Sequence, residues 1–151
     1  MKRKCAVPVR LQLSRRHGFN LQELSMATNG LPAVNVARPG KWGNPFIVSK
    51  DGTRDECCDW YSLMLCGQFM LCGSPSIAEM REAKAFVCEN IEQLRGHNLA
   101  CWCRAGRCHA DTLLRIAKLW RPGKPVAPRH ADPILYARLK AEPMKMFNAR
   151  S

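Results

Sequence analysis

Two stretches of the chain combine a helix-start signal with the spacing of an amphipathic helix. Thr53 with Glu56, and Ser76 with Glu79, match the capping box, in which two side chains satisfy backbone N–H groups at a helix start. Behind each box, apolar residues recur every three or four positions, which is the period of one helix face. The first stripe is Cys57, Trp60, Tyr61, Met64 and Leu65, and the second is Ile77, Met80, Val87, Ile91 and Leu94, interrupted by Lys84. The pattern predicts one helix that begins after residue 53 and another that begins after residue 76.

Three short stretches have the composition of β-strands. Residues 9–13 alternate apolar and polar side chains, residues 33–37 are mostly apolar and stop at a turn signal, and residues 98–103 are almost continuously apolar. A further helix is predicted over residues 110–120, whereas residues 21–29 fit no single pattern. This order predicts an α/β fold: a small, single-domain, Rossmann-like layer structure with a short central sheet flanked by helices.

The length and charge distribution divide the chain into a body and two basic ends. The 151 residues suffice for one domain with a buried core. We expect a basic tail over residues 1–8, the α/β domain over residues 9–120, and a basic linker with a short helix over residues 121–151. Asp132 followed by Pro133 marks the start of that terminal helix. The net charge of +12 is concentrated at the ends, which either hold a nucleic acid through its phosphates or only aid solubility.

The cysteine pattern and the lack of long apolar runs indicate the cellular compartment in which we expect the protein. No stretch approaches the roughly 20 apolar residues that span a bilayer, and no apolar segment follows the basic start as in a secretory signal. We therefore expect no membrane partner. The nine cysteines are an odd number and include an adjacent pair at Cys57 and Cys58, which is unlike a secreted disulfide framework. The sequence favours a reducing, cytoplasmic setting.

The segment from residue 101 to residue 109 holds the densest candidate chemistry. Cys101, Cys103, Cys108 and His109 are four soft ligands within nine residues. They could bind zinc as a Cys₃His site, although the spacing is not that of a standard finger and adjacent Cys and His ligands are geometrically awkward. The loop and the following helix start could instead hold a phosphate or carboxylate, with a cysteine or histidine as nucleophile or proton carrier. In the third interpretation the cysteines fill the core and His109 caps the helix.

A second candidate segment starts at Arg38 and ends at Phe46. Its glycines and prolines predict a loop. Arg38 and Lys41 can meet anionic groups, Trp42 and Phe46 can stack on a flat ring, and Asn44 can make paired hydrogen bonds to a base or amide. The alternative is a structural turn in which Trp42 anchors the loop in the core.

Taken together, three ordered motifs resemble a known protein family. They are RLQLSRRHGF at residues 10–19, VARPGKWGNPF at residues 36–46, and LRGHNLACWC at residues 94–103 followed by CHAD at residues 108–111. This arrangement resembles the family called "domain of unknown function 4326", over about residues 9–120.

The resemblance implies which segments define the family, but it supplies no established activity. Such proteins are common in bacteriophage and bacterial genomes, and the defining segments would be the RPxKWGNPF-like and CWC…CHAD-like ones. The family more often has a proline-containing, less basic loop where this chain has Arg-Ala-Gly-Arg at residues 104–107. These two arginines are therefore assigned no family role.

The two candidate segments share one site if the strands that precede them are parallel. In open α/β sheets, ligands bind beyond the carboxyl ends of parallel strands. Strands 33–37 and 98–103 would then send both loops to one edge. A count of two intervening helices favours antiparallel strands unless the chain crosses back, and we expect the parallel arrangement.

Our leading hypothesis is a nucleotide- or nucleic-acid-related domain, with an enzyme acting on a nucleoside, nucleotide or base as one form of it. Whether it is an enzyme stays open. The residues assigned to ligand binding are Arg38, Lys41, Trp42, Asn44, Cys101 and Cys103, and those assigned to catalysis are Cys108, His109 and Asp111. Asp111 has the alternative role of an ordinary first-turn acid favoured by the helix dipole.

Two further hypotheses come from other classes of function. In one, Cys101, Cys103, Cys108 and His109 hold structural zinc in a non-catalytic protein whose basic ends grip DNA or RNA. In the other, the protein is a phage or host regulator that acts through protein contacts. The cofactor is accordingly left open, with zinc as one candidate.

Overall fold

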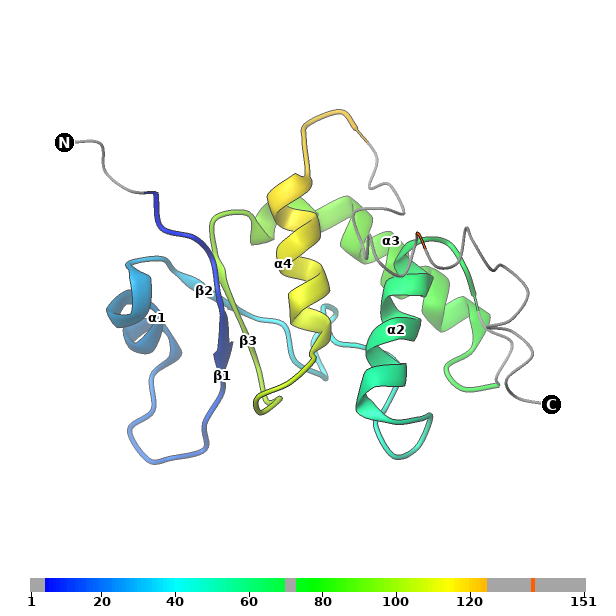
Figure 1. Ribbon diagram of the computed structural model, residues 1–151, viewed down its shortest axis with the longest axis horizontal. Coiled ribbons are helices and arrows are strands. Elements are labelled where there is room, and N and C mark those ends of the chain that lie inside the picture. The colour runs from blue at the N-terminus through cyan, green and yellow to red at the C-terminus, as the bar shows by residue number, and fades with distance from the viewer. Residues whose placement is uncertain (1–4, 70–72, 125–136, 138–151) are drawn as a thin grey trace.

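The central sheet places both candidate segments at one edge. The computed structural model describes residues 5–69, 73–124 and 137 (Figure 1). Strand β3 (Asn98–Cys101) lies between β1 (Arg10–Gln12) and β2 (Ala33–Asn35) and pairs in parallel with both. The α/β class and the parallel arrangement are thus confirmed. The count of two intervening helices, which favoured antiparallel strands, therefore does not decide the strand direction here.

The two predicted capping boxes are present and start the two longest described helices. Helix α2 (Arg54–Leu65) begins at Thr53, whose hydroxyl accepts from the Glu56 N–H, and Glu56 accepts from the Thr53 N–H in return. Helix α3 (Ile77–Asn90) begins in the same way. A short 3₁₀ helix, η1 (Ile91–Leu94), continues from α3 and leads the chain to β3.

The segment that fitted no single pattern is a helix, α1 (Leu21–Asn29). The Asn20 side chain accepts from the backbone N–H groups of Gln22 and Glu23, and Gly30 ends the helix with a φ of 76°. Its hydrophobic face is narrow, since Ser25 is its one buried member. The caps, which were available in the sequence, identify this helix better than its apolar spacing does.

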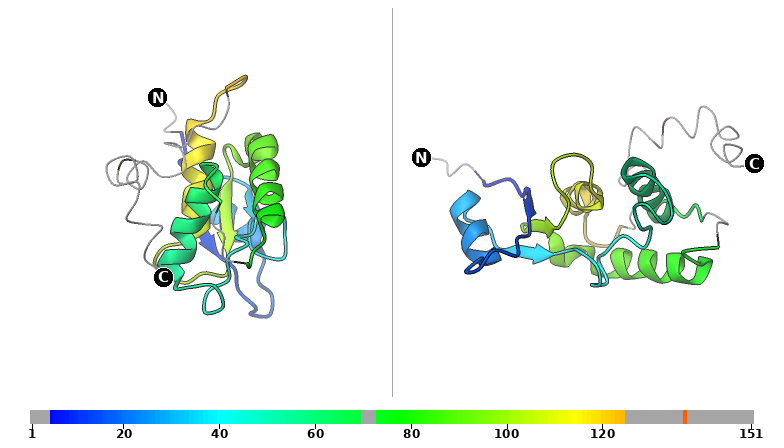
Figure 2. Two further views of the ribbon diagram at one scale, coloured as in Figure 1. Left: turned by 90° about the vertical axis from the view of Figure 1, so that its right-hand side faces the viewer. Right: turned by 90° about the horizontal axis from the view of Figure 1, so that it is seen from below.

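Helices cover the two faces of the sheet. Figure 2 shows α4 (His109–Leu119) and α2 on one side of the strands and α3 on the other. A buried hydrogen bond of 3.0 Å between the hydroxyls of Ser62 and Thr112 joins α2 to α4. The largest fully buried side chains are Tyr61, Phe46, Met64, Leu65, Met80, Ile91, Leu94, Leu99, Leu113, Ile116, Val36 and Val87.

The amino-terminal edge of the sheet is closed by a buried amide network. The Asn98 side chain accepts from the Val9 N–H and donates to Ser25 and Asn29. Because every polar atom of this side chain is paired, the network fixes α1 against β3. The opposite, carboxyl edge is the one that opens toward solvent.

Two sequence-based expectations concern regions beyond this description. The short C-terminal helix predicted after Asp132 falls, apart from residue 137, outside the described residues, as do residues 1–4 of the predicted basic tail. Among the helices that are described, none has both the length and the apolar character needed to cross a bilayer.

Candidate ligand and metal site at the carboxyl edge of the sheet

The loops that follow β2 and β3 line one cavity. Both strands point the same way, so both loops leave from the carboxyl edge. The cavity has a volume of about 180 Å³, below the roughly 300–1,000 Å³ of pockets that enclose a drug-sized ligand. It therefore suits one functional group or an ion rather than a large molecule. Its lining comprises Ala37, Arg38, Asn44, Phe46, Val48, Arg54, Cys57, Cys58, Cys101, Trp102, Cys103, Arg107, Cys108 and His109.

The loop from Arg38 to Phe46 uses most of its side chains to hold its own shape. The Asn44 amide donates to the Cys57 carbonyl at 3.1 Å, and its oxygen accepts from the Phe46 N–H at 3.0 Å. Asn44 lines the cavity, and both polar atoms of its amide already make one bond each within the protein. Phe46 is buried and packs against Trp60 with ring centroids 5.6 Å apart.

The structure corrects the ligand-binding roles expected of Trp42 and Lys41. Trp42 is buried and meets Phe86 edge to face at 4.8 Å, so it is the core anchor of the alternative interpretation and not a stacking platform. Lys41 lies over the Phe86 ring at 5.6 Å and faces a groove along α3 instead of the cavity. Core packing has taken the place of ligand contact at Trp42, whereas Lys41 stays exposed beside α3.

Arg38 is the cation of this loop that faces the cavity. Within the described part of the chain its guanidinium makes no hydrogen bond or ion pair. Its side chain passes close to Gly43, where an added Cβ would fall 2.6 Å from the Arg38 Cγ. Glycine at residue 43 therefore leaves the space through which Arg38 reaches the cavity.

Arg54, at the start of α2, holds the cysteine-containing loop from outside. Its guanidinium donates to the carbonyls of Arg104, Ala105 and Arg107 at 2.5, 3.0 and 2.6 Å. Arg107 in turn pairs with Asp59 at 2.7 Å. The sequence analysis missed Arg54, because nothing in its local pattern separates it from an ordinary first-turn helix residue.

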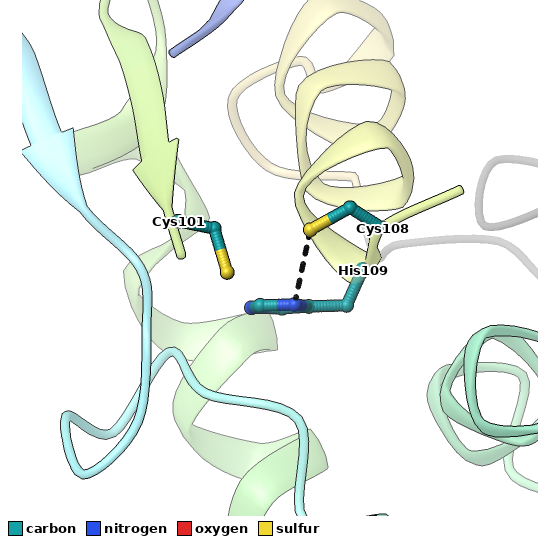
Figure 3. Close-up of side chains that lie close together, drawn as sticks. All are labelled: Cys101, Cys108 and His109. Carbon is teal, nitrogen blue, oxygen red and sulfur yellow. Dashed lines mark hydrogen bonds between the residues drawn. The ribbon is translucent and has the colours of Figure 1, made fainter. Parts of the chain in front are cut away.

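The loop so held brings three thiols and one imidazole together. The sulfur atoms of Cys101 and Cys103 are 3.7 Å apart, and the Cys108 sulfur is 3.6 Å from Nδ1 of His109 (Figure 3). The ligand atoms of Cys101, Cys108 and His109 all lie within 4.8 Å of one another. Hydrogen bonds from the neighbouring thiols of Cys101 and Cys108 lower the pKa of Cys103.

His109 is held in one tautomer by the strand beside it. Its Nε2 lies 2.8 Å from the Val36 carbonyl, which can only accept, so Nε2 carries the proton and donates. Burial lowers the pKa of His109, and the neutral ring keeps its lone pair on Nδ1. That lone pair faces the thiols, while the edge of the ring packs against Tyr61 at 5.3 Å.

Asp111 is engaged away from the cavity. Its carboxylate accepts from the Cys108 N–H at 3.1 Å and pairs with Arg10 at 3.1 Å. These are the contacts of an acid in the first turn of a helix, and Asp111 does not line the cavity. The structure thus favours the alternative stated for Asp111 over the role of proton carrier.

Trp102 is the exposed aromatic ring of the cavity. It is 44% exposed and lines the cavity, with the Arg15 guanidinium 5.1 Å from its ring centroid. Because β3 ends at Cys101, alternation along a strand does not decide the side of Trp102, and the sequence analysis assigned this residue no role. The exposed ring is thus in the second loop, whereas Trp42 and Phe46 of the first loop are buried.

The fold and this site define a small α/β domain with a parallel sheet and a cavity at its carboxyl edge, built by the two motif-bearing loops. The chain belongs to the family described as "Domain of unknown function (DUF4326)", whose model matches residues 20–119. The match includes both loops and confirms the resemblance seen in the sequence, although the motif at residues 10–19 lies outside it. No curated protein and no solved structure matches the chain significantly.

Proposed function

We propose that this domain binds a nucleotide, or the phosphorylated end of a nucleic acid, at the carboxyl edge of its sheet. One observation carries the proposal: Arg38 and Trp102, which is 44% exposed, line the same small cavity. A guanidinium recognises phosphate through paired hydrogen bonds, and an exposed indole face stacks on a base. A nucleotide is the common ligand that carries both groups.

The size of the cavity limits which part of a nucleotide can enter it. A volume of about 180 Å³ takes a phosphate group or part of a base, and the rest of the ligand would rest on Trp102. Arg54 and Arg107 add positive charge around the cavity although their hydrogen bonds are already made. We expect this binding in the cytoplasm, where thiols stay reduced, and no disulfide joins the cysteines of the described segments.

Calorimetric titration with AMP, GMP, CMP and UMP tests the proposal, with adenosine and inorganic phosphate as half-ligands. We expect at least one mononucleotide to bind more tightly than either half. Arg38→Gln should weaken that binding about tenfold or more, because a charge-assisted hydrogen bond is lost. Trp102→Leu should weaken it by a similar factor through lost stacking.

Arg121→Gln is the matched control, since Arg121 follows the far end of α4 and bonds to carbonyls of residues 118 and 120. Its affinity should equal that of the unaltered protein. Absence of nucleotide binding at millimolar concentration, or equal affinity in Arg38→Gln, would overturn the proposal.

A further inference from the structure

Two spacings within the four-residue cluster match those of ligand atoms around one tetrahedral metal ion. With a zinc–sulfur bond of about 2.3 Å and a zinc–nitrogen bond of about 2.0–2.1 Å, two sulfurs lie about 3.8 Å apart and a sulfur and a nitrogen about 3.6 Å apart. The observed values are 3.7 Å for Cys101 with Cys103 and 3.6 Å for Cys108 with His109. The two spacings are those of S–H hydrogen bonds and equally those of two ligands that share one zinc ion.

The local backbone explains how consecutive residues can both be ligands. Cys108 is extended, with φ −150° and ψ 148°, whereas His109 is the first residue of α4. This change of conformation turns both side chains toward Cys101, as Figure 3 shows. The sulfur atoms of Cys108 and Cys101 lie within 4.8 Å of each other. The geometric objection to adjacent Cys and His ligands therefore does not apply here.

His109 has the second-shell partner typical of a metal ligand. Metal-binding histidines almost always donate their other ring N–H to a carboxylate, a backbone carbonyl or water, which fixes the tautomer and aims the lone pair. The bond from Nε2 of His109 to the Val36 carbonyl, at 2.8 Å, does this. It leaves Nδ1 as the ligand atom on the side of the thiols.

We propose that Cys101, Cys103, Cys108 and His109 bind one Zn²⁺ ion in a tetrahedral Cys₃His site. Thiolates with one imidazole in this geometry suit zinc, and four protein ligands close the coordination sphere as in structural sites. The ion ties the end of β3 to the start of α4 and, through His109, to the residue after β2. Cys108 and His109 then act as metal ligands and not as nucleophile or proton carrier.

The surroundings match the charge of such a centre. Three thiolates and one Zn²⁺ carry a net charge of −1. The guanidinium groups of Arg54 and Arg107 line the same cavity and offset that charge. This assignment goes beyond nucleotide binding, because it concerns the cysteine and histidine side chains alone. The metal would bind whether or not a nucleotide is present.

The metal content of the unaltered protein is the first test. Native mass spectrometry and elemental analysis of the reduced protein, purified without chelator, should give one zinc per chain. Cobalt(II) substitution should give the visible d–d bands of tetrahedral Co²⁺ together with near-ultraviolet thiolate-to-cobalt charge-transfer bands. Reduced protein with neither stoichiometric zinc nor this spectrum would overturn the proposal, and so would a metal-free protein with Cys101 and Cys103 joined in a disulfide.

Variants then assign the ligands. Cys103→Ser should weaken the thiolate-to-cobalt bands and lower metal affinity by more than about a hundredfold, since loss of a second-shell contact alone costs 10–100-fold. His109→Cys should keep the metal but shift the cobalt spectrum toward four sulfurs, which makes the histidine testable without removing the ion. Metal binding that is equal in Cys103→Ser, or a spectrum that is unchanged in His109→Cys, would refute the ligand set.

Two other cysteines serve as matched controls. Cys58 lines the same cavity, and burial raises its pKa to about 11, while Cys88 lies half-buried on α3. Cys58→Ser and Cys88→Ser should each keep one zinc and the full cobalt spectrum. These measurements use no nucleotide, so their failure would leave nucleotide binding standing, and the converse also holds.

Discussion

The two loops at the carboxyl edge contain similar numbers of chemically capable side chains and use them in opposite ways. In the loop from Arg38 to Phe46, the tryptophan and phenylalanine are buried and the asparagine bonds to backbone groups. In the loop after Cys101, Arg54 holds the backbone from outside, and the side chains of Cys101 and Cys103 face the cavity. The first loop thus uses its aromatic and amide side chains mainly to stabilise the fold, whereas the second loop leaves thiols and one exposed ring at the cavity.

The comparison predicts that the two tryptophans differ most in their contribution to stability. Trp42→Ala removes a buried ring packed on Phe86 and should lower the free energy of unfolding by about 3–5 kcal/mol. Trp102→Ala removes a half-exposed ring with one cation–π contact and should cost about 1 kcal/mol or less. Urea unfolding of both variants measures the difference. Equal losses would contradict the division between a structural loop and a ligand-facing one.

Asn44 should behave as a structural residue although it lines the cavity. Asn44→Ala leaves the buried Phe46 N–H without a partner and removes the side-chain bond to the Cys57 carbonyl in α2, so we expect a loss of about 1–3 kcal/mol in the free energy of unfolding. Asn35→Ala is the control, since Asn35 caps the Ala37 N–H from an exposed position where water can replace it.

The binding measurement separates the structural role of Asn44 from ligand contact. Well below its unfolding temperature, Asn44→Ala should keep nucleotide affinity within a few fold, whereas Arg38→Gln should not. A larger loss of affinity in Asn44→Ala than in Arg38→Gln would restore the asparagine as a ligand-binding group.

Sequence reasoning succeeded where local chemistry decides the outcome. The capping boxes at Thr53 and Ser76 needed only residues three apart, and both are present. The proximity of the two loops followed from strand direction, because parallel strands end at one edge. Both inferences rest on short-range geometry or on a rule of topology.

Sequence reasoning failed where a tertiary partner decides the outcome. Trp42 and Trp102 each lie in a motif, and only the position of Phe86 shows which one is buried. Arg54 lies 50 residues or more before the carbonyls that it holds, and no local pattern encodes that pairing. The predicted strand at residues 98–103 was too long because the chain leaves the sheet after Cys101.

The hydrogen bonds from Arg54 to the loop at residues 104–107, which we call the Arg54 clamp, should protect that loop from proteolysis. Arg54→Ala removes three charge-assisted hydrogen bonds at a partly exposed position, so we expect a loss of about 1–2 kcal/mol in the free energy of unfolding. Trypsin should then cleave after Arg104 and Arg107 several times faster, because local opening of the loop costs less.

Arg54→Lys provides the matched control for geometry as opposed to charge. A single ammonium group cannot reach three carbonyls as the planar guanidinium does, so cleavage should again be faster. Cleavage after Arg95 in the same digest serves as the internal reference. Unchanged cleavage after Arg104 and Arg107 would show that the loop keeps its shape without the clamp.

Substitution of Asp111 should have the smallest effect on the free energy of unfolding. It also tests whether Asp111 lies outside the ligand-binding cavity. Asp111→Asn keeps an oxygen that can accept from the Cys108 N–H but loses the charge that faces Arg10. Because the ion pair is partly exposed, we expect a loss of about 0.5–1 kcal/mol, which should shrink at high salt. Nucleotide affinity should stay within twofold in the same calorimetric titration. A tenfold loss of affinity would place Asp111 in the site after all, since a first-turn acid that only caps its helix has no route to the ligand.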